Sequence, residues 1–335
     1  KQATAYAFEG YITDQPGPYK VRVVKANSFN SPGSSFFTNI TNAQVSIQSN
    51  NGYTYNLTCD TTGYYLTNPD EFTGIVGNSY RLSVTLADGQ KFMSDYETLL
   101  ACADIDTLTA KYYTKNKLTS DGYSYYDEIE DGLMIMNSTK TQNYTPYYRY
   151  ECQLVLQTHQ HYSEPIPGRD FYIYRPVTSV GNLFIANAED YADKHIINNQ
   201  LFQTQMTALF YKDETLIEDS EFALRDCGEF VLVRQYSMGK QQFNYWNTLN
   251  DQLKNTNYLF GQIENQAEGN IHCITNESVK ALGYFSASAV KTRIHAFSLT
   301  ERNHTTYSYD IKYFPEIDSV TIFETIPQFF ISFIY

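Results

Sequence analysis

The histidines are the side chains best suited to acid–base or metal chemistry, and the chain has six of them. His159 and His161 are two positions apart, which on a strand would place both imidazoles on the same face. Such a pair could give two ligands to a metal ion, but zinc sites use roughly three or four protein ligands, and no third one is identifiable. The remaining histidines are isolated in the sequence: His195, His272, His295 and His304. We therefore interpret the histidines as structural or surface residues and predict no metal site.

The densest group of carboxylates lies at residues 127–131, which include Asp127, Glu128, Glu130 and Asp131. Carboxylate oxygens are suitable ligands for calcium. A calcium loop, however, follows the pattern D-x-[DN]-x-[DN]-G, which turns the chain around the ion, and this stretch lacks that pattern. We interpret it as a solvated acidic face.

The five cysteines are Cys59, Cys102, Cys152, Cys227 and Cys273, and none belongs to a C-x-x-C pair. No histidine lies at zinc spacing from them, which argues against a zinc site. Cys59 and Cys102 fall in the same predicted domain and could form a disulfide if their strands are neighbours. An odd number leaves at least one thiol free, and we treat all five as structural.

Common catalytic motifs are also missing from the chain. It contains no G-x-S-x-G nucleophile motif, no H-E-x-x-H metalloprotease motif and no G-x-x-x-x-G-K-[ST] phosphate loop. We therefore predict a protein that is not an enzyme, with no catalytic residue, no cofactor and no metal. The sequence singles out no partner-binding residue.

The charge and composition indicate the class of fold and exclude one class of partner. The 335 residues carry a formal net charge of −13, so a phosphate backbone would be repelled and we expect no nucleic-acid partner. The 31 tyrosines and 21 phenylalanines favour strands, on which a tyrosine ring packs while its hydroxyl meets water. The length allows about two domains, so we expect two β-rich domains.

Short strands separated by turn signals fill residues 1–105. A Pro/Gly turn at residues 15–18 separates two strands, and Asn51-Gly52 and Asp88-Gly89 are the expected turns of two β-hairpins. Alternation places Tyr80, Leu82 and Val84 on one inward face. This order is similar to an immunoglobulin-like antiparallel β-sandwich of the prealbumin or carboxypeptidase-regulatory type, which we predict for this domain.

Residues 106–335 are predicted to form a second β-rich domain with one or a few helices. Strands are expected around residues 148–156 and near residue 231, and short strands at residues 208–225. One amphipathic helix is expected at residues 241–257, with an apolar stripe formed by Phe243, Trp246, Leu249 and Leu253. We interpret Trp246 as the packing anchor of this helix; the alternative is a platform on which a sugar ring stacks.

Four segments of the chain carry a family resemblance. They are FEGYITDQPGPYKVRV at residues 8–23, PYYRYECQ at 146–153, VLVRQYSMGKQQFNYWNTLNDQL at 231–253 and GNIHCITNESVKALGYFSAS at 269–288. Together they resemble a Bacteroidetes family known as domain of unknown function 4249, over nearly the whole chain.

Two motifs match that family residue by residue. The family's first motif tends to read E-G-x-I-T-D-x-x-G-P-Y, and its counterparts here are Glu9, Gly10, Ile12, Thr13, Asp14, Gly17, Pro18 and Tyr19. The last motif is matched by Gly269, Asn270, Ile271, Gly283, Tyr284, Phe285, Ala287 and Ser288. The chain departs from the family at residues 31–39 and in the acidic stretch near Asp127, where transfer from the family is weakest.

The resemblance implies a lipoprotein of the outer membrane, tethered by an acylated cysteine upstream of Lys1 and lying at the cell surface. It also implies a TonB-dependent receptor-like barrel protein as the partner, for which this chain would be an accessory subunit or lid. A lipid tether agrees with the chain's lack of an apolar run of about 20 residues, the length needed to span a bilayer. The family has no established enzymatic chemistry, so no catalytic residue is carried over.

Two other functions stay open at this point. A glycan- or nutrient-binding surface lipoprotein would use tyrosine and tryptophan rings to stack on its ligand. A structural subunit of an envelope assembly or secretion machine would differ in the barrel with which it co-purifies.

Overall fold

The computed structural model describes residues 5–26, 37–120, 124–162, 169–178, 183–205, 225–255, 267–298, 307–310 and 321–323. As predicted, these residues are mainly β. The chain forms two compact units, each assembled from three separate stretches. Unit 1 consists of Lys1–Cys102, Asn143–Arg149 and Tyr236–Val290, and unit 2 of Ala103–Gln142, Tyr150–Gln235 and Lys291–Tyr335.

The units differ from the predicted division into residues 1–105 and 106–335. The first stretch of unit 1 ends close to the predicted boundary, but two later stretches return to the same unit. The physical reason is a pairing that local patterns do not reveal: strand β18 (Lys280–Ser288) runs parallel to strand β1 (Ala5–Thr13) from Ala5↔Lys280 to Thr13↔Ser288. A parallel pair needs a long connection, and here most of the chain supplies it.

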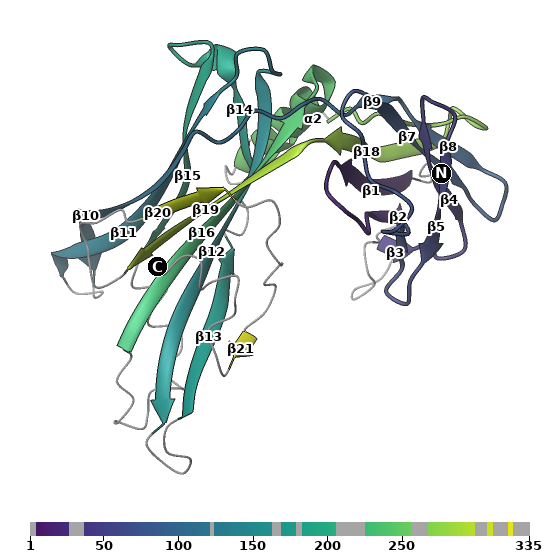
Figure 1. The fold of residues 1–335 in the computed structure, drawn as a ribbon. Helices are drawn as coiled ribbons and strands as arrows, with labels where there is room; N and C mark the ends of the chain where they lie inside the picture. The colour runs from purple at the N-terminus through teal and green to yellow at the C-terminus, as the bar shows by residue number, and fades with distance from the viewer. Residues whose placement is uncertain are drawn as a thin grey trace. The chain divides into compact units, whose positions relative to one another are not determined.

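An 11-stranded sheet forms most of unit 1, in the order β17-β8-β7-β4-β5-β6-β2-β1-β18, with β3 beside β2 and β9 beside β7 (Figure 1). Its other strands are β2 (Lys20–Ala26), β3 (Phe37–Asn39), β4 (Gln44–Ser49), β5 (Thr54–Cys59), β6 (Tyr64–Leu66), β7 (Ser79–Thr85), β8 (Lys91–Ser94), β9 (Glu97–Thr98) and β17 (Ile271–Cys273). The described pairings between strands of this sheet are antiparallel apart from β1 with β18; Leu100 also forms an isolated parallel bridge with Ser288 of β18.

Both predicted hairpins are confirmed. Asn51-Gly52 connects β4 to β5, and Asp88-Gly89 connects β7 to β8. Gly52 and Gly89 have φ angles of +94° and +88°, a left-handed conformation that glycine adopts without strain. The inward face of β7 is also as predicted, because Tyr80, Leu82 and Val84 are each 1% exposed.

The sheet of unit 1 curls into two layers around an aromatic core. The rings of Tyr6 and Phe8 on β1 lie 5.2 and 4.8 Å from the ring of Phe92 on β8, although β1 and β8 are distant in the strand order. Phe72 packs between Tyr19 and Tyr55, at ring distances of 5.4 and 4.1 Å. Such aromatic contacts stabilise a core beyond the area they bury, so this cluster holds the two layers together.

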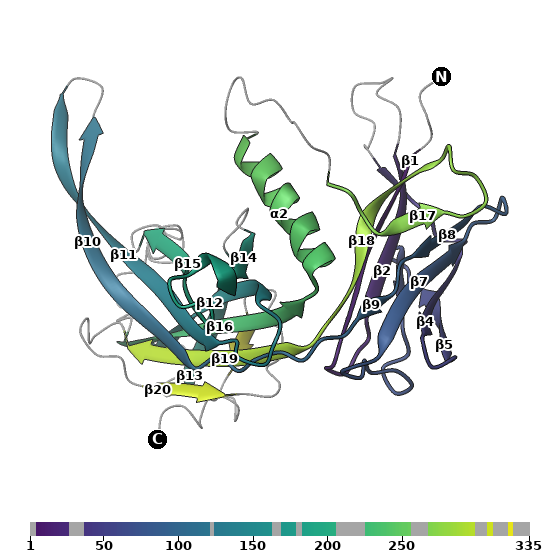
Figure 2. The same ribbon diagram turned by 90° about the horizontal axis from the view of Figure 1, so that it is seen from above.

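The predicted helix is confirmed as α2 (Lys240–Asn255), which lies beside β18 (Figure 2). Its buried face differs from the predicted stripe, because Gln242 is 1% exposed whereas Leu253 is 51% exposed. The inward side of α2 is formed by residues at the spacing of three and four that defines one side of a helix: Gln242, Tyr245, Trp246 and Leu249. The tyrosine at position 245 packs on Tyr284, with ring centroids 4.9 Å apart, and this contact turns that side of α2 inward.

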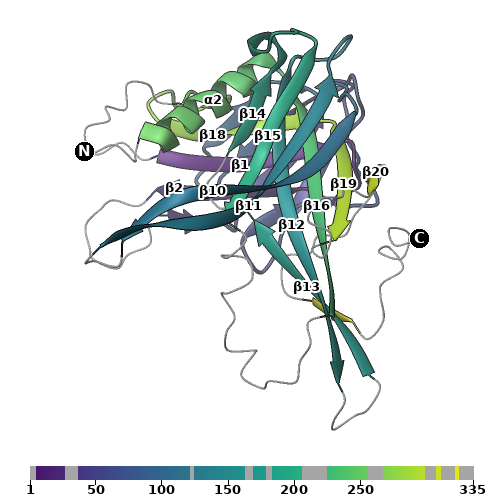
Figure 3. The same cartoon turned by 90° about the vertical axis from the view of Figure 1, so that its left-hand side faces the viewer.

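Unit 2 contains a three-stranded and a seven-stranded sheet (Figure 3). The first has the order β10-β11-β15 and consists of β10 (Thr107–Ser120), β11 (Tyr125–Lys140) and β15 (Ile196–Gln205). The second has the order β20-β19-β16-β12-β13-β21, with β14 beside β12. Its strands are β12 (Tyr147–Tyr162), β13 (Arg169–Thr178), β14 (Phe184–Asn187), β16 (Arg225–Met238), β19 (Val290–Ser298), β20 (Tyr307–Asp310) and β21 (Thr321–Phe323), and a 3-10 helix, η1, spans Ala188–Asp190.

The strands predicted around residues 148–156 and near residue 231 are confirmed as β12 and β16. The prediction for residues 208–225 lies almost entirely outside the described residues. Thr139 of β11 donates a hydrogen bond of 2.6 Å to Gln235 of β16, and both side chains are fully buried, so the two sheets face each other there. In the described part of the chain, no helix has the length and apolar character required to cross a membrane.

Candidate functional site

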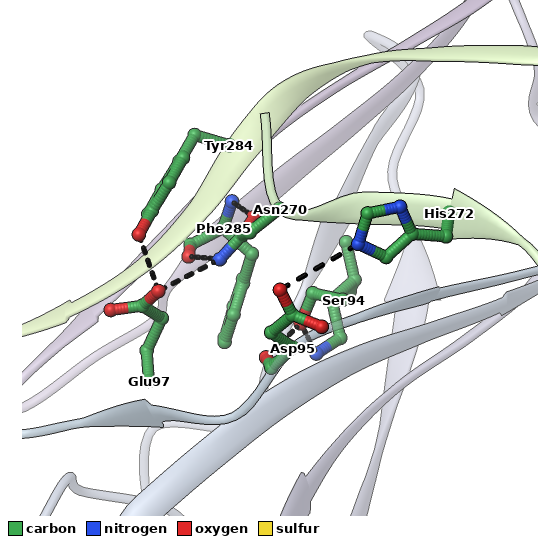
Figure 4. Close-up of polar contacts among 8 residues, drawn as sticks. Ser94, Asp95, Glu97, Asn270, His272, Tyr284 and Phe285 are labelled. Atoms are coloured by element: carbon green, nitrogen blue, oxygen red, sulfur yellow. Dashed lines mark hydrogen bonds and ion pairs between the residues drawn. The ribbon is translucent and has the colours of Figure 1, made fainter. Parts of the chain in front are cut away.

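Among the residues whose side chains the structure describes, Glu97 is the only buried Asp or Glu, at 7% exposure. It belongs to the short strand β9, which pairs with β7. Asn270 donates a hydrogen bond of 3.0 Å from Nδ2 to Glu97 Oε1, and the Tyr284 hydroxyl donates to the same oxygen (Figure 4). Two parts of the chain that are far apart in the sequence, β9 and the stretch that contains Asn270 and Tyr284, therefore meet at one carboxyl group.

Asn270 acts as a clamp between the two ends of the curled sheet. Its side chain accepts a 2.9 Å hydrogen bond from the Phe285 N–H and donates one of 2.9 Å to the Phe285 carbonyl on β18. Its backbone carbonyl accepts a 2.8 Å bond from the N–H of Asp95, just after β8. The amide of Asn270 thus pairs with β18 as a neighbouring strand would, and it satisfies buried backbone groups that water does not reach.

Two glycines of the last motif allow the backbones to approach each other at this clamp. A Cβ atom on Gly269 would lie 1.9 Å from the carbonyl oxygen of Gly283, and one on Gly283 would lie 1.9 Å from the carbonyl oxygen of Phe8. Gly283 also has φ +100°. Any side chain at either position would collide with main chain, so glycine is required at both. We call Glu97, Gly269, Asn270, Gly283, Tyr284 and Phe285 the seam of unit 1.

Burial raises the pKa of the Glu97 carboxyl, and the nearby carboxylate of Asp95 raises it further, while the hydrogen bonds from Tyr284 and Asn270 act in the opposite direction. Burial and the neighbouring Glu97 likewise raise the pKa of Tyr284. A raised carboxyl pKa is common at catalytic sites, but side chains of 7% and 5% exposure offer little surface to a substrate. The arrangement is better suited to holding backbone segments together than to a reaction.

The first family motif is joined to the last one at the opposite end of β1. The carboxylate of Asp14 accepts a 2.8 Å hydrogen bond from the N–H of Val290, which is the first residue of β19 and lies two positions beyond β18. The buried hydroxyl of Tyr19 donates to the carbonyl of Thr13, at 2.6 Å, and accepts from the N–H of Gly74. These contacts fix the loop between β1 and β2, so the motif that contains Asp14 and Tyr19 also has a structural role.

The two central family segments meet around α2. Tyr147 stacks on Phe243 with ring centroids 4.9 Å apart, and the Arg149 guanidinium lies 4.2 Å from the ring centroid of Tyr236 and 5.6 Å from that of Trp246. The buried Nε1 of Trp246 and its contact with Arg149 agree with the interpretation of this residue as a packing anchor. A sugar ring would have to displace the cation, so the stacking-platform alternative gains no support.

The histidines do not assemble into a site in the described residues. His195 and His272 are exposed, and the Nε2 atom of His272 lies 3.6 Å from a carboxylate oxygen of Asp95. His295 is buried, and burial together with the nearby Arg293 lowers its pKa to about 4. The side chains of His159 and His161, and the whole of His304, lie outside the described residues. Within those residues, no three His, Cys, Asp or Glu side chains are grouped so that they could hold a metal ion.

The acidic stretch at residues 127–131 lies on β11, opposite residues 114–118 of β10. The structure does not describe the side chains of this stretch, so its interpretation as a solvated face stays a prediction. Cys59, Cys102, Cys152 and Cys273 take part in no disulfide, so the pairing that the sequence allowed between Cys59 and Cys102 is not formed. Burial raises the pKa of Cys152 to about 12, which makes it an unreactive thiol. The side chain of Cys227 lies outside the described residues.

The comparisons with known proteins give one match. The family described as domain of unknown function (DUF4249) matches residues 2–294. No curated protein and no solved structure matches the chain.

Proposed function

Because the chain belongs to the DUF4249 family, we propose that it is a non-enzymatic lipoprotein of the outer membrane that serves as an accessory subunit or lid of a TonB-dependent receptor-like barrel protein. In this proposal an acylated cysteine upstream of residue 1 tethers the protein to the membrane, and the folded part lies at the cell surface. Its function is to offer a shaped surface to the barrel.

One observation supports this proposal over a catalytic function. The residues that identify the family are used to close the fold of unit 1: Gly269 and Gly283 let backbones approach, and Asn270 pairs with the main chain of Phe285. A family signature that serves shape rather than chemistry is expected of a protein selected for its surface.

The direct test is affinity purification of the tagged, full-length protein from detergent-solubilised native membranes, with an unrelated lipoprotein bearing the same tag as the control. We expect a TonB-dependent receptor-like barrel protein to co-purify with this chain in stoichiometric amount. The control lipoprotein should not bring this barrel protein with it. Labelling with a fatty-acid analogue should mark the protein at its upstream cysteine. Recovery of the protein as a lone monomer, or without attached lipid, would contradict the proposal.

A further inference from the structure

Three loops lie at one end of the strands of unit 1, and they expose large apolar side chains. They are residues 14–19 between β1 and β2, residues 50–53 between β4 and β5, and residues 67–78 between β6 and β7. We call these three loops the loop end of unit 1. Tyr53, Ile75 and Val76 are 64%, 58% and 46% exposed there. Single exposed apolar residues are normal on a protein surface, but neighbouring ones often mark a place where another molecule binds.

Hydrogen bonds hold the longest of these loops against the other two. The N–H of Gly74 donates to the carbonyl of Thr13 at the end of β1, over 3.0 Å. On the other side, the Asn50 N–H donates to the carbonyl of Ser79 at 2.9 Å, and the Ser79 N–H donates to the Asn50 side chain at 3.2 Å. The three loops therefore lie side by side and can contact one partner together.

The exposed apolar pair at positions 75 and 76 begins a turn whose backbone is fixed. The N–H of Asn78 donates to the carbonyl of Ile75, and Gly77 has φ +90°, which suits the third position of such a turn. The Ile75 N–H donates at 2.9 Å to the hydroxyl of the buried Tyr80, and the Gly77 N–H donates at 2.9 Å to the carbonyl of Leu99. A fixed backbone loses little freedom on binding, so the apolar pair is preorganised to enter a pocket.

The charge of the loop end restricts the kind of partner that it fits. Its three loops contain Asp14, Asp70 and Glu71 but no Lys, Arg or His, and the last two carboxylates are exposed in the same loop as the apolar pair. An anionic membrane surface would repel these loops, because it attracts basic segments. A protein pocket that has an apolar floor and Lys or Arg side chains at its rim complements both the apolar pair and the carboxylates.

Given the function proposed above, on which this assignment rests, we propose that the loop end of unit 1 is the surface that docks on the barrel protein. Ile75 and Val76 enter an apolar pocket of the partner, and the carboxylates of Asp70 and Glu71 face basic side chains at the rim of that pocket. Buried apolar side chains near the centre of an interface contribute much of its affinity. Charges at the rim mainly orient the two proteins and speed their association.

The test compares how much barrel protein co-purifies with variants of the tagged, full-length protein from native membranes. The double variant Ile75→Ser, Val76→Ser should lower that amount about tenfold or more, because small polar side chains leave the pocket without its apolar contacts. The matched control is Ile274→Ser, which removes an isoleucine of 55% exposure at the opposite end of the strands and should change nothing. Urea unfolding followed by Trp246 fluorescence shows whether the variants fold like the unaltered protein.

Two further measurements test direct contact and the charge of the rim. With the photo-crosslinking residue p-benzoylphenylalanine in place of Val76, light should join the chain to the same barrel protein, whereas the same residue in place of Ile274 should give no such adduct. Asp70→Asn combined with Glu71→Gln should make co-purification less sensitive to salt. Asp88→Asn, which removes an exposed carboxylate from the β7–β8 turn, should leave the salt sensitivity as it is.

The outcomes separate the docking surface from the function on which it rests. If the barrel protein co-purifies equally with the unaltered protein and the double variant, the proposed function stands and the loop end is not the docking surface. An equal loss with Ile274→Ser would also overturn the assignment, as would unchanged salt sensitivity without the two rim carboxylates. If no barrel protein co-purifies with the unaltered protein, the proposed function fails and the docking surface fails with it.

Discussion

Gly283→Ala is expected to unfold unit 1 or to prevent it from forming. A Cβ atom at this position would lie 1.9 Å from the carbonyl oxygen of Phe8, and this neighbour is main chain of β1 that cannot rotate away. The paired strands β1 and β18 would have to separate, at a cost above about 4 kcal/mol. This cost is large compared with the free energy of unfolding of an ordinary domain, which is about 5–15 kcal/mol. Urea unfolding followed by the fluorescence of Trp246 measures this, because the chain has a single tryptophan and it lies in unit 1.

Gly89→Ala is the matched control for this effect. Gly89 has a similar positive φ of +88°, but a Cβ there would meet nothing within 4 Å. Its substitution should cost only the backbone strain of an alanine in this conformation, about 1–2 kcal/mol. Equal effects of the two substitutions would show that φ alone matters and that the close approach of β18 to β1 does not.

Asn270→Ala is expected to destabilise unit 1 by about 3–5 kcal/mol, the second largest effect. The substitution removes three hydrogen bonds and leaves the N–H and carbonyl of Phe285 buried without these partners, while Glu97 loses one of its two donors. Leaving buried polar groups unpaired costs more than the bonds themselves contribute, because water does not replace the lost partner. The Trp246 fluorescence transition in urea is again the measurement.

Two further variants make the Asn270 result specific. Asn276→Ala removes an amide that accepts from the N–H of Ser278 in an exposed turn, and it should change stability by at most about 1 kcal/mol. Asn270→Asp keeps the acceptor for the Phe285 N–H but places a second carboxylate against Glu97. It should be strongly destabilised at neutral pH and should recover part of the loss in acid, where the two carboxyl groups can share protons.

Short sequence patterns were sufficient to predict the hairpins and strands that depend on neighbouring residues. Asn51-Gly52 and Asp88-Gly89 predicted both hairpins because a tight turn of this kind needs residues that tolerate positive φ. Alternation along residues 148–154 predicted β12, since Tyr148, Cys152 and Leu154 all lie in the interior. The hairpin of β10 and β11 was missed, because polar residues dominate the stretch at 103–145 and hide its period of two.

The seam could not be predicted in this way. Its assembly depends on β18 pairing in parallel with β1, and nothing in the neighbourhood of either strand specifies a partner so distant in sequence. The family resemblance points to Gly269, Asn270 and Gly283, but it does not show that these residues meet in the fold. The sequence does not predict that Glu97 is buried, because a glutamate in the polar sequence Asp95-Tyr96-Glu97 is expected to be exposed. Its burial depends on the hydrogen bonds from Asn270 and Tyr284, which come from a distant part of the chain.

The central claim is that the family signature closes the sheet of unit 1, and the exchange rate of the Phe285 amide tests it most directly. In the unaltered protein this N–H donates to the Asn270 side chain, so it should be well protected, as should the amides of the β4–β5 hairpin. In Asn270→Ala we predict that the Phe285 amide exchanges much faster, whereas the hairpin amides change only as far as the lower stability of unit 1 requires. A Phe285 amide that keeps its full protection without Asn270 would contradict the claim.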